Sequence, residues 1–209
     1  MNNLTTFYLV RHAQTEWNVK GIVQGGTTDS PLTESGKKVS KELAGKFKDI
    51  KFDLVFSSDL LRAKRTAKII VLEKNLAVRT TELLRERSFG EFDGKANSEL
   101  RAVHELLSKL EDYEKYSYKH SKEYESDEDV TNRFLTFIRE MAVSYPNKSV
   151  LIVSHGSFIR LALMRMGFGD YRSLPPGSVK NGGWVKFETD GVDFFIKDHE
   201  GISKLNYVE

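Results

Sequence analysis

The sequence predicts an α/β protein, because short apolar runs of strand length alternate with longer segments of helical periodicity. Two of these strand-length runs end in the same way. Residues 7–10 lead into Arg11 and His12, and residues 150–154 lead into His155. Two strands that each present a histidine at the same kind of edge indicate one site. We therefore expect the two ends of the chain to belong to one domain.

The N-terminal half predicts two further strands, each preceded by a helix. After a loop rich in Gly and Thr, Thr33 is a suitable N-cap for a helix that extends to about Phe47. Residues 54–56 form the second strand. A helix follows at once, with its apolar residues on one face up to Val71, and residues 76–78 form a short third strand.

The C-terminal half begins with irregular, glycine-containing sequence between residues 84 and 94. Apolar spacing then predicts one helix over about residues 98–116. Ser126, which is followed by three acidic residues, predicts the start of another helix. A last helix is expected over residues 157–166, and the tail predicts a β-hairpin within residues 184–196.

The composition limits the possible functions. The chain has 209 residues and is 39% hydrophobic, which allows a substantial core. Its net charge is only +2, which gives no sign of nucleic-acid binding. No apolar run has the length of a membrane span, and no signal peptide is expected. The absence of cysteine excludes disulfides and thiolate metal sites and is compatible with a reducing cytoplasm. We expect one domain over residues 1–209 in a cytoplasmic protein without nucleic-acid or membrane partners.

Five polar residues together predict a site for a phosphoryl group. They stand near the ends of the predicted strands and are Arg11, His12, Arg62, Glu86 and His155. A phosphate monoester carries nearly two negative charges at neutral pH. Arginine offers a planar fork of donors to phosphate oxygens, and neutral imidazole is a competent nucleophile. Two guanidiniums and a protonated imidazole would balance the charge of the ester.

Five blocks of sequence around these residues resemble the signatures of the histidine phosphatase superfamily, which includes the phosphoglycerate mutases. The blocks follow that family's order and are residues 9–18, 29–36, 57–67, 84–94 and 153–156. They are spread over most of the chain, and their pattern is most similar to that of the broad-specificity phosphatases. The resemblance implies a three-layer α/β/α sandwich with a mostly parallel central sheet.

The resemblance also implies a role for each residue. His12 would attack phosphorus and become a transient phosphohistidine, and Glu86 would protonate the leaving alcohol and then help to deprotonate water. The residues implied to surround or contact the phosphoryl oxygens are Arg11, Asn18, Gln24, Arg62, His155 and Gly156. Backbone N–H groups near Gly156 and Ser157, at the start of the next helix, are a further expected contact. No cofactor and no metal are expected.

Three functions remain open from the sequence: hydrolysis of small phosphomonoesters, 2,3-bisphosphoglycerate-dependent phosphoglycerate mutase activity, and non-catalytic phosphate binding. The resemblance implies that a mutase would carry adjacent arginines between Gly94 and Ser126, where this chain has only Arg101. We therefore predict a phosphatase rather than an isomerase, with residues 95–125 as a lid or rim over the pocket. A homodimer is compatible with the sequence. The histidines outside the blocks are expected to be surface or packing residues: His104, His120 and His199.

Overall fold

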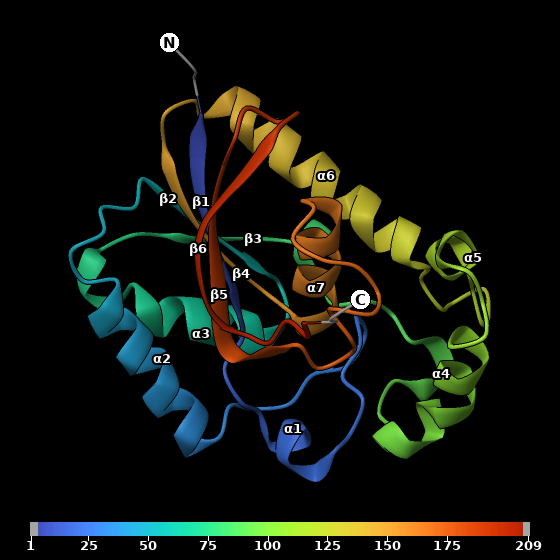
Figure 1. Cartoon of the computed structure of the whole chain (residues 1–209). Helices are drawn as coiled ribbons and strands as arrows, with labels where there is room; N and C mark the ends of the chain where they lie inside the picture. The colour runs from blue at the N-terminus through green and yellow to red at the C-terminus, as the bar shows by residue number, and fades with distance from the viewer. Residues whose placement is uncertain (1–3, 207–209) are drawn as a thin grey trace.

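The computed structural model describes residues 4–206, and one six-stranded sheet forms its centre (Figure 1). The strands are β1 (Thr5–Arg11), β2 (Leu54–Ser58), β3 (Val78–Thr81), β4 (Ser149–Ser154), β5 (Val179–Thr189) and β6 (Phe194–Ile202). Their order in the sheet is β3-β2-β4-β1-β5-β6. The first four run parallel to one another, whereas β5 and β6 join the sheet antiparallel. The mostly parallel sheet is confirmed, and it takes strands from both ends of the chain.

Alternating side chains of the central strands pack against helices on both faces of the sheet. The covering helices are α2 (Glu34–Lys46), α3 (Leu61–Ile70), α6 (Asp127–Ser144) and α7 (Gly156–Arg165). In β1, Phe7 and Leu9 pack with α6 and α7. Tyr8 and Val10 point to the other face and pack with α2 and α3. Because β1 and β4 are buried on both faces, they are continuous apolar runs in the sequence. The three-layer sandwich is confirmed.

The strand register brings the predicted site residues to one edge of the sheet. Arg11 pairs with Ser154, so His12 and His155 leave neighbouring strands at the same level. β4 lies between β1 and β2, and β2 leads into α3, which carries Arg62. Ligands of open α/β sheets bind at the carboxyl ends of the parallel strands. The fold therefore creates the expected meeting of the N-terminal and C-terminal motifs.

Two local elements differ from the sequence prediction. The third strand is Val78–Thr81 rather than residues 76–78, because Asn75 adopts a left-handed conformation with φ 51° and the chain extends only after it. A short helix, α1 (Glu16–Lys20), interrupts the segment after β1, with Thr15 as its N-cap. A helix of five residues is too short to be recognised from helical periodicity in the sequence.

The single helix predicted over residues 98–116 is wrong. The chain forms a 3-10 turn (Asn97–Leu100), then α4 (Arg101–Leu107) and α5 (Asp112–Ser117). The break occurs because the backbone of Glu111 is extended and its side chain caps α5. Five side chains hold this region in a small apolar cluster of its own: Val23, Phe92, Leu100, Val103 and Tyr124.

The terminal hairpin is confirmed and is longer than its apolar residues predict. β5 and β6 pair from Thr189 opposite Phe194 to Val179 opposite Ile202, with an irregular stretch before Trp184. The part of the edge strand β6 beyond Ile196 begins with four exposed polar residues, Lys197 to Glu200, so it carries no apolar pattern. None of the helices in residues 4–206 has the length and apolar character required to cross a bilayer.

Candidate active site

His12 lies at the carboxyl end of β1, and its contacts fix one tautomer. Only 3% of its surface is exposed. Its Nδ1 atom lies 2.8 Å from the carbonyl oxygen of Ala13. Because a carbonyl oxygen only accepts, Nδ1 carries the hydrogen and Nε2 keeps its lone pair. Burial lowers the pKa of His12 well below 6.5, and the nearby cations Arg62 and Arg11 lower it further. The ligand-free protein thus holds a neutral imidazole with a nucleophilic Nε2.

His155 faces His12 across the site, with the ring centroids 5.2 Å apart. It is fully buried, and within the described part of the chain neither of its ring nitrogens has a hydrogen-bond partner. Burial lowers the pKa of His155 well below 6.5, and the nearby groups Arg62, His12 and Arg11 lower it further. In the ligand-free protein a further charge beside two guanidiniums is disfavoured, so His155 is neutral there. The protonated imidazole was expected opposite a bound ester and stays a prediction for that complex. A phosphate dianion would supply the missing counter-charge.

Acidification is expected to destabilise the ligand-free protein through these two imidazoles. The pKa values of His12 and His155 in the folded protein lie below 6.5, so below that pH the unfolded chain binds protons that the folded chain does not. Stability is therefore fully present above about pH 6.5 and falls as the pH drops, by about 1.4 kcal/mol per pH unit for each imidazole, until its folded-state pKa is reached.

Urea unfolding at about pH 7.5 and about pH 5.5 measures this effect. His155→Gln should lose less stability between the two pH values than the wild type. The exposed surface variant His199→Gln serves as the matched control and should behave as the wild type does. Equal pH dependence in His155→Gln and the wild type would contradict the account.

Arg62 is fully buried at the start of α3 and is held by the loop that precedes Ser30. Its guanidinium donates to the carbonyl oxygens of Thr28 (2.6 Å), Gly25 (3.0 Å) and Gln24 (3.3 Å) and to Oδ1 of Asp29 (3.2 Å). Asp29 also accepts from the backbone N–H groups of Leu61 and Arg62, so it caps α3 from a distant segment. These contacts hold the charge at the site. The sequence placed Asp29 in a family block but did not reveal this role, because the role depends on contacts with residues distant in the sequence.

Arg11 approaches the start of α7 closely because residue 156 has no side chain. A Cβ atom on Gly156 would lie 3.1 Å from Cζ of Arg11. The Arg11 Nη1 group donates to the carbonyl oxygen of Val179 at 2.6 Å. Burial lowers the pKa of Arg11, the Glu86 carboxylate opposes this effect, and Arg62 adds to it. The two guanidiniums and the carboxylate are therefore within electrostatic reach of one another.

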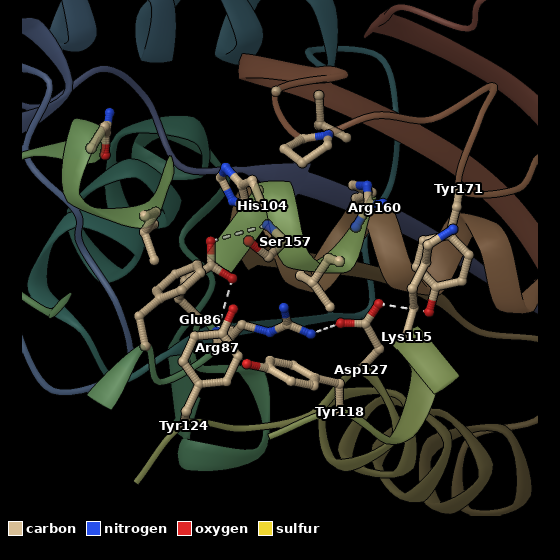
Figure 2. A pocket seen from close by; sticks show the side chains of 18 of the residues that line it. Glu86, Arg87, His104, Lys115, Tyr118, Tyr124, Asp127, Ser157, Arg160 and Tyr171 are labelled. Atoms are coloured by element: carbon tan, nitrogen blue, oxygen red, sulfur yellow. Dashed lines mark hydrogen bonds and ion pairs between the residues drawn. The ribbon is translucent and has the colours of Figure 1, made fainter. Parts of the chain in front are cut away.

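Glu86 lies across the N-terminal end of α7 (Figure 2). Its Oε2 accepts from the backbone N–H of Ser157 at 3.0 Å, and its Oε1 accepts from those of Phe158 and Arg87 at 3.1 and 2.9 Å. Acidic groups are favoured at the positive end of a helix dipole. The expected phosphate contact with the Ser157 N–H is therefore wrong, since Glu86 occupies that group. The N–H of Gly156 is not among those that Glu86 binds.

Asn18 and Gln24 meet around Thr15. Gln24 Nε2 donates to Thr15 Oγ1 at 2.8 Å, so its side chain is committed to this network. The Asn18 Oδ1 atom accepts from the Thr15 N–H at 3.0 Å and from Nδ2 of Asn181 at 3.2 Å. Asn181 also donates to the carbonyl oxygen of His12 at 3.1 Å. Because its oxygen is occupied, Asn18 has its Nδ2 group to offer a phosphate. Sequence reasoning gave Asn181 no role, since its glycine-rich context has no specific signature.

A cavity of about 550 Å³ extends from this site beneath the segment of residues 95–125. Its base includes Arg11, Glu86 and Gly156. The residues of the segment that line it are Asn97, Leu100, His104, Leu107, Ser108, Lys115, Tyr118 and Tyr124. His104 is exposed, as expected for a surface residue, and it also borders the cavity, where desolvation lowers its pKa. The cavity provides space for the alcohol part of an ester.

A chain of polar contacts closes the far side of the cavity. Arg87 forms an ion pair with Asp127, and the Tyr171 hydroxyl donates to the other Asp127 oxygen at 2.8 Å (Figure 2). Burial raises the pKa of Tyr171 to about 12, so the hydroxyl keeps its hydrogen and donates. Sequence reasoning missed all three residues. Arg87 follows Glu86 directly, which was the available signal, whereas Asp127 and Tyr171 meet only in the fold.

Metal-binding side chains do not gather at the site. Across residues 4–206, no three His, Cys, Asp or Glu side chains are placed to share a metal ion. The charges gathered at the site are those of Arg11 and Arg62, with the imidazoles of His12 and His155 beside them.

A nucleophilic imidazole, two buried guanidiniums and a carboxyl group at one sheet edge define a site for phosphoryl transfer through histidine. The comparison with known families agrees with this class. A family model for the histidine phosphatase superfamily (branch 1) matches residues 7–200, and the chain belongs to this family.

Three similar proteins illustrate the relationship. The uncharacterized phosphatase PhoE of Bacillus subtilis (strain 168) is 33% identical over 167 residues, which is 80% of each chain. The solved structure of Bacillus stearothermophilus YhfR has a TM-score of 0.79 and 27% identity, covering 92% of this chain and 95% of that one. A phosphoserine phosphatase from Entamoeba histolytica, solved in complex with 3-phosphoglyceric acid, has a TM-score of 0.72 and 25% identity, with coverage of 93% and 96%. The family and the named relatives support a hydrolase over an isomerase.

Proposed function

We propose that this protein hydrolyses small phosphomonoesters through a phosphohistidine formed at His12. The observation that carries the proposal is the state of His12: its Nδ1 hydrogen is committed to Ala13, its pKa is lowered, and its Nε2 lone pair is therefore present at neutral pH. A purely structural role for this histidine would not explain an unused Nε2 lone pair placed among buried guanidiniums.

The reaction has two displacement steps. In the first, Nε2 of His12 forms a bond to phosphorus while the bond from phosphorus to the ester oxygen breaks. Glu86, which takes up a proton when the phosphate dianion binds beside it, gives that proton to the leaving alcohol. In the second, water attacks phosphorus, Glu86 takes a proton from that water, and the bond to Nε2 breaks. Arg11, Arg62 and His155 stabilise the charge on the phosphoryl oxygens in both steps. The enzyme returns to its starting state without a metal or cofactor.

The alternatives have less support. The one arginine between residues 95 and 125, Arg101, forms an ion pair with Glu105 and does not line the main cavity, so it is a poor ligand for the carboxylate of a phosphoglycerate. A non-catalytic phosphate-binding module would require neither the nucleophile nor an acid such as Glu86. We propose that residues 95–125 form the rim of the pocket. The homodimer, the cytoplasmic location and the absence of nucleic-acid and membrane partners remain predictions.

Glu86→Gln tests the proposed function by way of the leaving group. In the presence of EDTA, the wild type should hydrolyse both glycerol 3-phosphate and p-nitrophenyl phosphate. Glu86→Gln should lose about 10²- to 10⁴-fold in kcat/KM for the glycerol ester, whose alcohol leaves only with a proton. It should lose less than about tenfold for p-nitrophenyl phosphate, because nitrophenolate leaves without help.

Glu91→Gln, at an exposed position in the same block, is the matched control and should retain activity on both esters. Equal losses of Glu86→Gln on the two esters would show that Glu86 is not the proton donor. A wild-type protein that hydrolyses neither ester would overturn the proposed function. Bisphosphoglycerate-dependent isomerisation of phosphoglycerate would identify a mutase instead.

A further inference from the structure

The wall of the cavity carries a guanidinium that the hydrolytic mechanism does not use. Arg160, on α7, lines the cavity, and its Nε donates to the carbonyl oxygen of Leu174 at 2.5 Å. The guanidinium stacks against Tyr171, with Cζ 5.6 Å from the ring centroid. No carboxylate in residues 4–206 lies within ion-pair distance of it. Burial lowers the pKa of Arg160 to about 10, and the neighbouring Arg87 adds to this effect.

Two other cations of this wall, Arg87 and Lys115, differ from Arg160 in having anionic partners. Arg87 is paired with Asp127, and Lys115 lies 2.9 Å from Asp112. Arg11 resembles Arg160, because it too has no ion-pair partner in the described part of the chain, and it faces the expected phosphate. A charge that is largely buried without a counter-ion is costly to maintain unless a ligand supplies one.

Arg160 lies one helical turn beyond the residue that Arg11 contacts. The Arg11 guanidinium lies against Gly156, and Arg160 follows Gly156 by four residues in α7. Residues i and i+4 of an α-helix share a face and are separated by about 6 Å along the axis. Figure 2 shows Ser157 and Arg160 on the same helix, bordering the cavity. The two unpaired guanidiniums are therefore spaced for two anionic groups on one small molecule.

We propose that Arg160 binds a second anionic group, a carboxylate or a second phosphate, carried by the alcohol part of the substrate. The preferred substrates are then phosphomonoesters of small hydroxy acids or small bisphosphates rather than esters of neutral alcohols. This inference rests on the proposed function and assigns the substrate class of the same site. Apolar residues that line the same cavity, including Leu100 and Leu107, suit a short carbon chain.

Steady-state kinetics of Arg160→Gln test this assignment with three esters: 3-phosphoglycerate, fructose 2,6-bisphosphate and glycerol 3-phosphate. The first two carry a carboxylate and a second phosphate, and the third has neither. The variant should raise KM about 10- to 100-fold for the preferred anionic ester and leave kcat unchanged, because a charged hydrogen bond to a non-reacting group contributes uniform binding. KM for glycerol 3-phosphate should change by less than about twofold.

Arg160→Lys should recover part of the affinity, since it keeps the charge and loses the planar fork. Arg165→Gln, at an exposed position of the same helix, should leave all three KM values unchanged. Which anionic ester is affected decides between a carboxylate and a phosphate as the second group. A KM that is unchanged for both anionic esters, or raised equally for all three, would overturn the assignment of Arg160 alone. No hydrolysis of any ester by the wild type, p-nitrophenyl phosphate included, would overturn the proposed function as well.

Discussion

His12→Ala is expected to lower kcat for phosphomonoester hydrolysis by at least about 10⁴-fold, because the variant has no atom that can accept the phosphoryl group. His155 is 5.2 Å away between ring centroids, but within the described residues neither of its ring nitrogens has a hydrogen-bond partner that would fix one tautomer. Release of inorganic phosphate from p-nitrophenyl phosphate measures the loss.

Two controls accompany this variant. His199→Ala removes an exposed histidine on β6 and should keep wild-type activity. The thermal unfolding midpoint of His12→Ala should fall by no more than a few degrees, since the lost imidazole is neutral and its removal costs one hydrogen bond and leaves a small cavity. Activity of His12→Ala within about tenfold of the wild type would exclude His12 as the nucleophile.

Arg62→Ala is expected to have the largest effect on stability. The side chain is fully buried and satisfies three backbone carbonyls of the loop before Ser30 as well as Asp29. Its removal leaves these acceptors unpaired and costs about 3–5 kcal/mol. For a protein of this length, the midpoint of thermal unfolding should fall by about 10 °C.

Arg65 offers a matched control, because it lies one turn further along α3 and is exposed. Arg65→Ala should change the free energy of unfolding by less than about 0.5 kcal/mol. Should Arg62→Ala fail to fold, Arg62→Lys gives the second measurement, with an intermediate midpoint because the charge remains while the fork of donors is lost. A midpoint for either Arg62 variant equal to that of Arg65→Ala would refute this role of the buried guanidinium.

Much of the sheet could be predicted because its signals are local. β1 and β4 are buried on both faces and therefore stand out as apolar runs. Thr33 and Ser126 start α2 and α6 as their capping chemistry predicts. The predicted position of β3 was about two residues too early, because an edge strand needs no apolar pattern.

The residues of the candidate site could be predicted from the sequence, whereas the contacts between them could not. The parallel sheet necessarily brings Arg11, His12 and His155 together, and sequence motifs identified Glu86. The position of the Glu86 carboxylate on the N–H of Ser157 depends on how distant segments pack, and no periodicity encodes it.

The region between residues 94 and 126 was the least predictable part of the chain. Its helices are short, and its small apolar cluster joins residues far apart in sequence, such as Val23 and Tyr124. Glu111 breaks the expected helix through a cap that apolar spacing does not detect. Because this region and α7 line the cavity, the proposed substrate class rests on tertiary contacts such as that of Arg160 with Tyr171.

The central claim is tested most directly by stopping the enzyme during turnover and locating the phosphoryl group on the chain. The wild type should be rapidly denatured at alkaline pH, where phosphohistidine persists, and its peptides analysed by mass spectrometry. We predict an acid-labile phosphoryl group on the peptide that contains His12, and its absence in His12→Ala. A phosphoryl group on another residue, or continued hydrolysis by a protein that never carries one, would contradict the account.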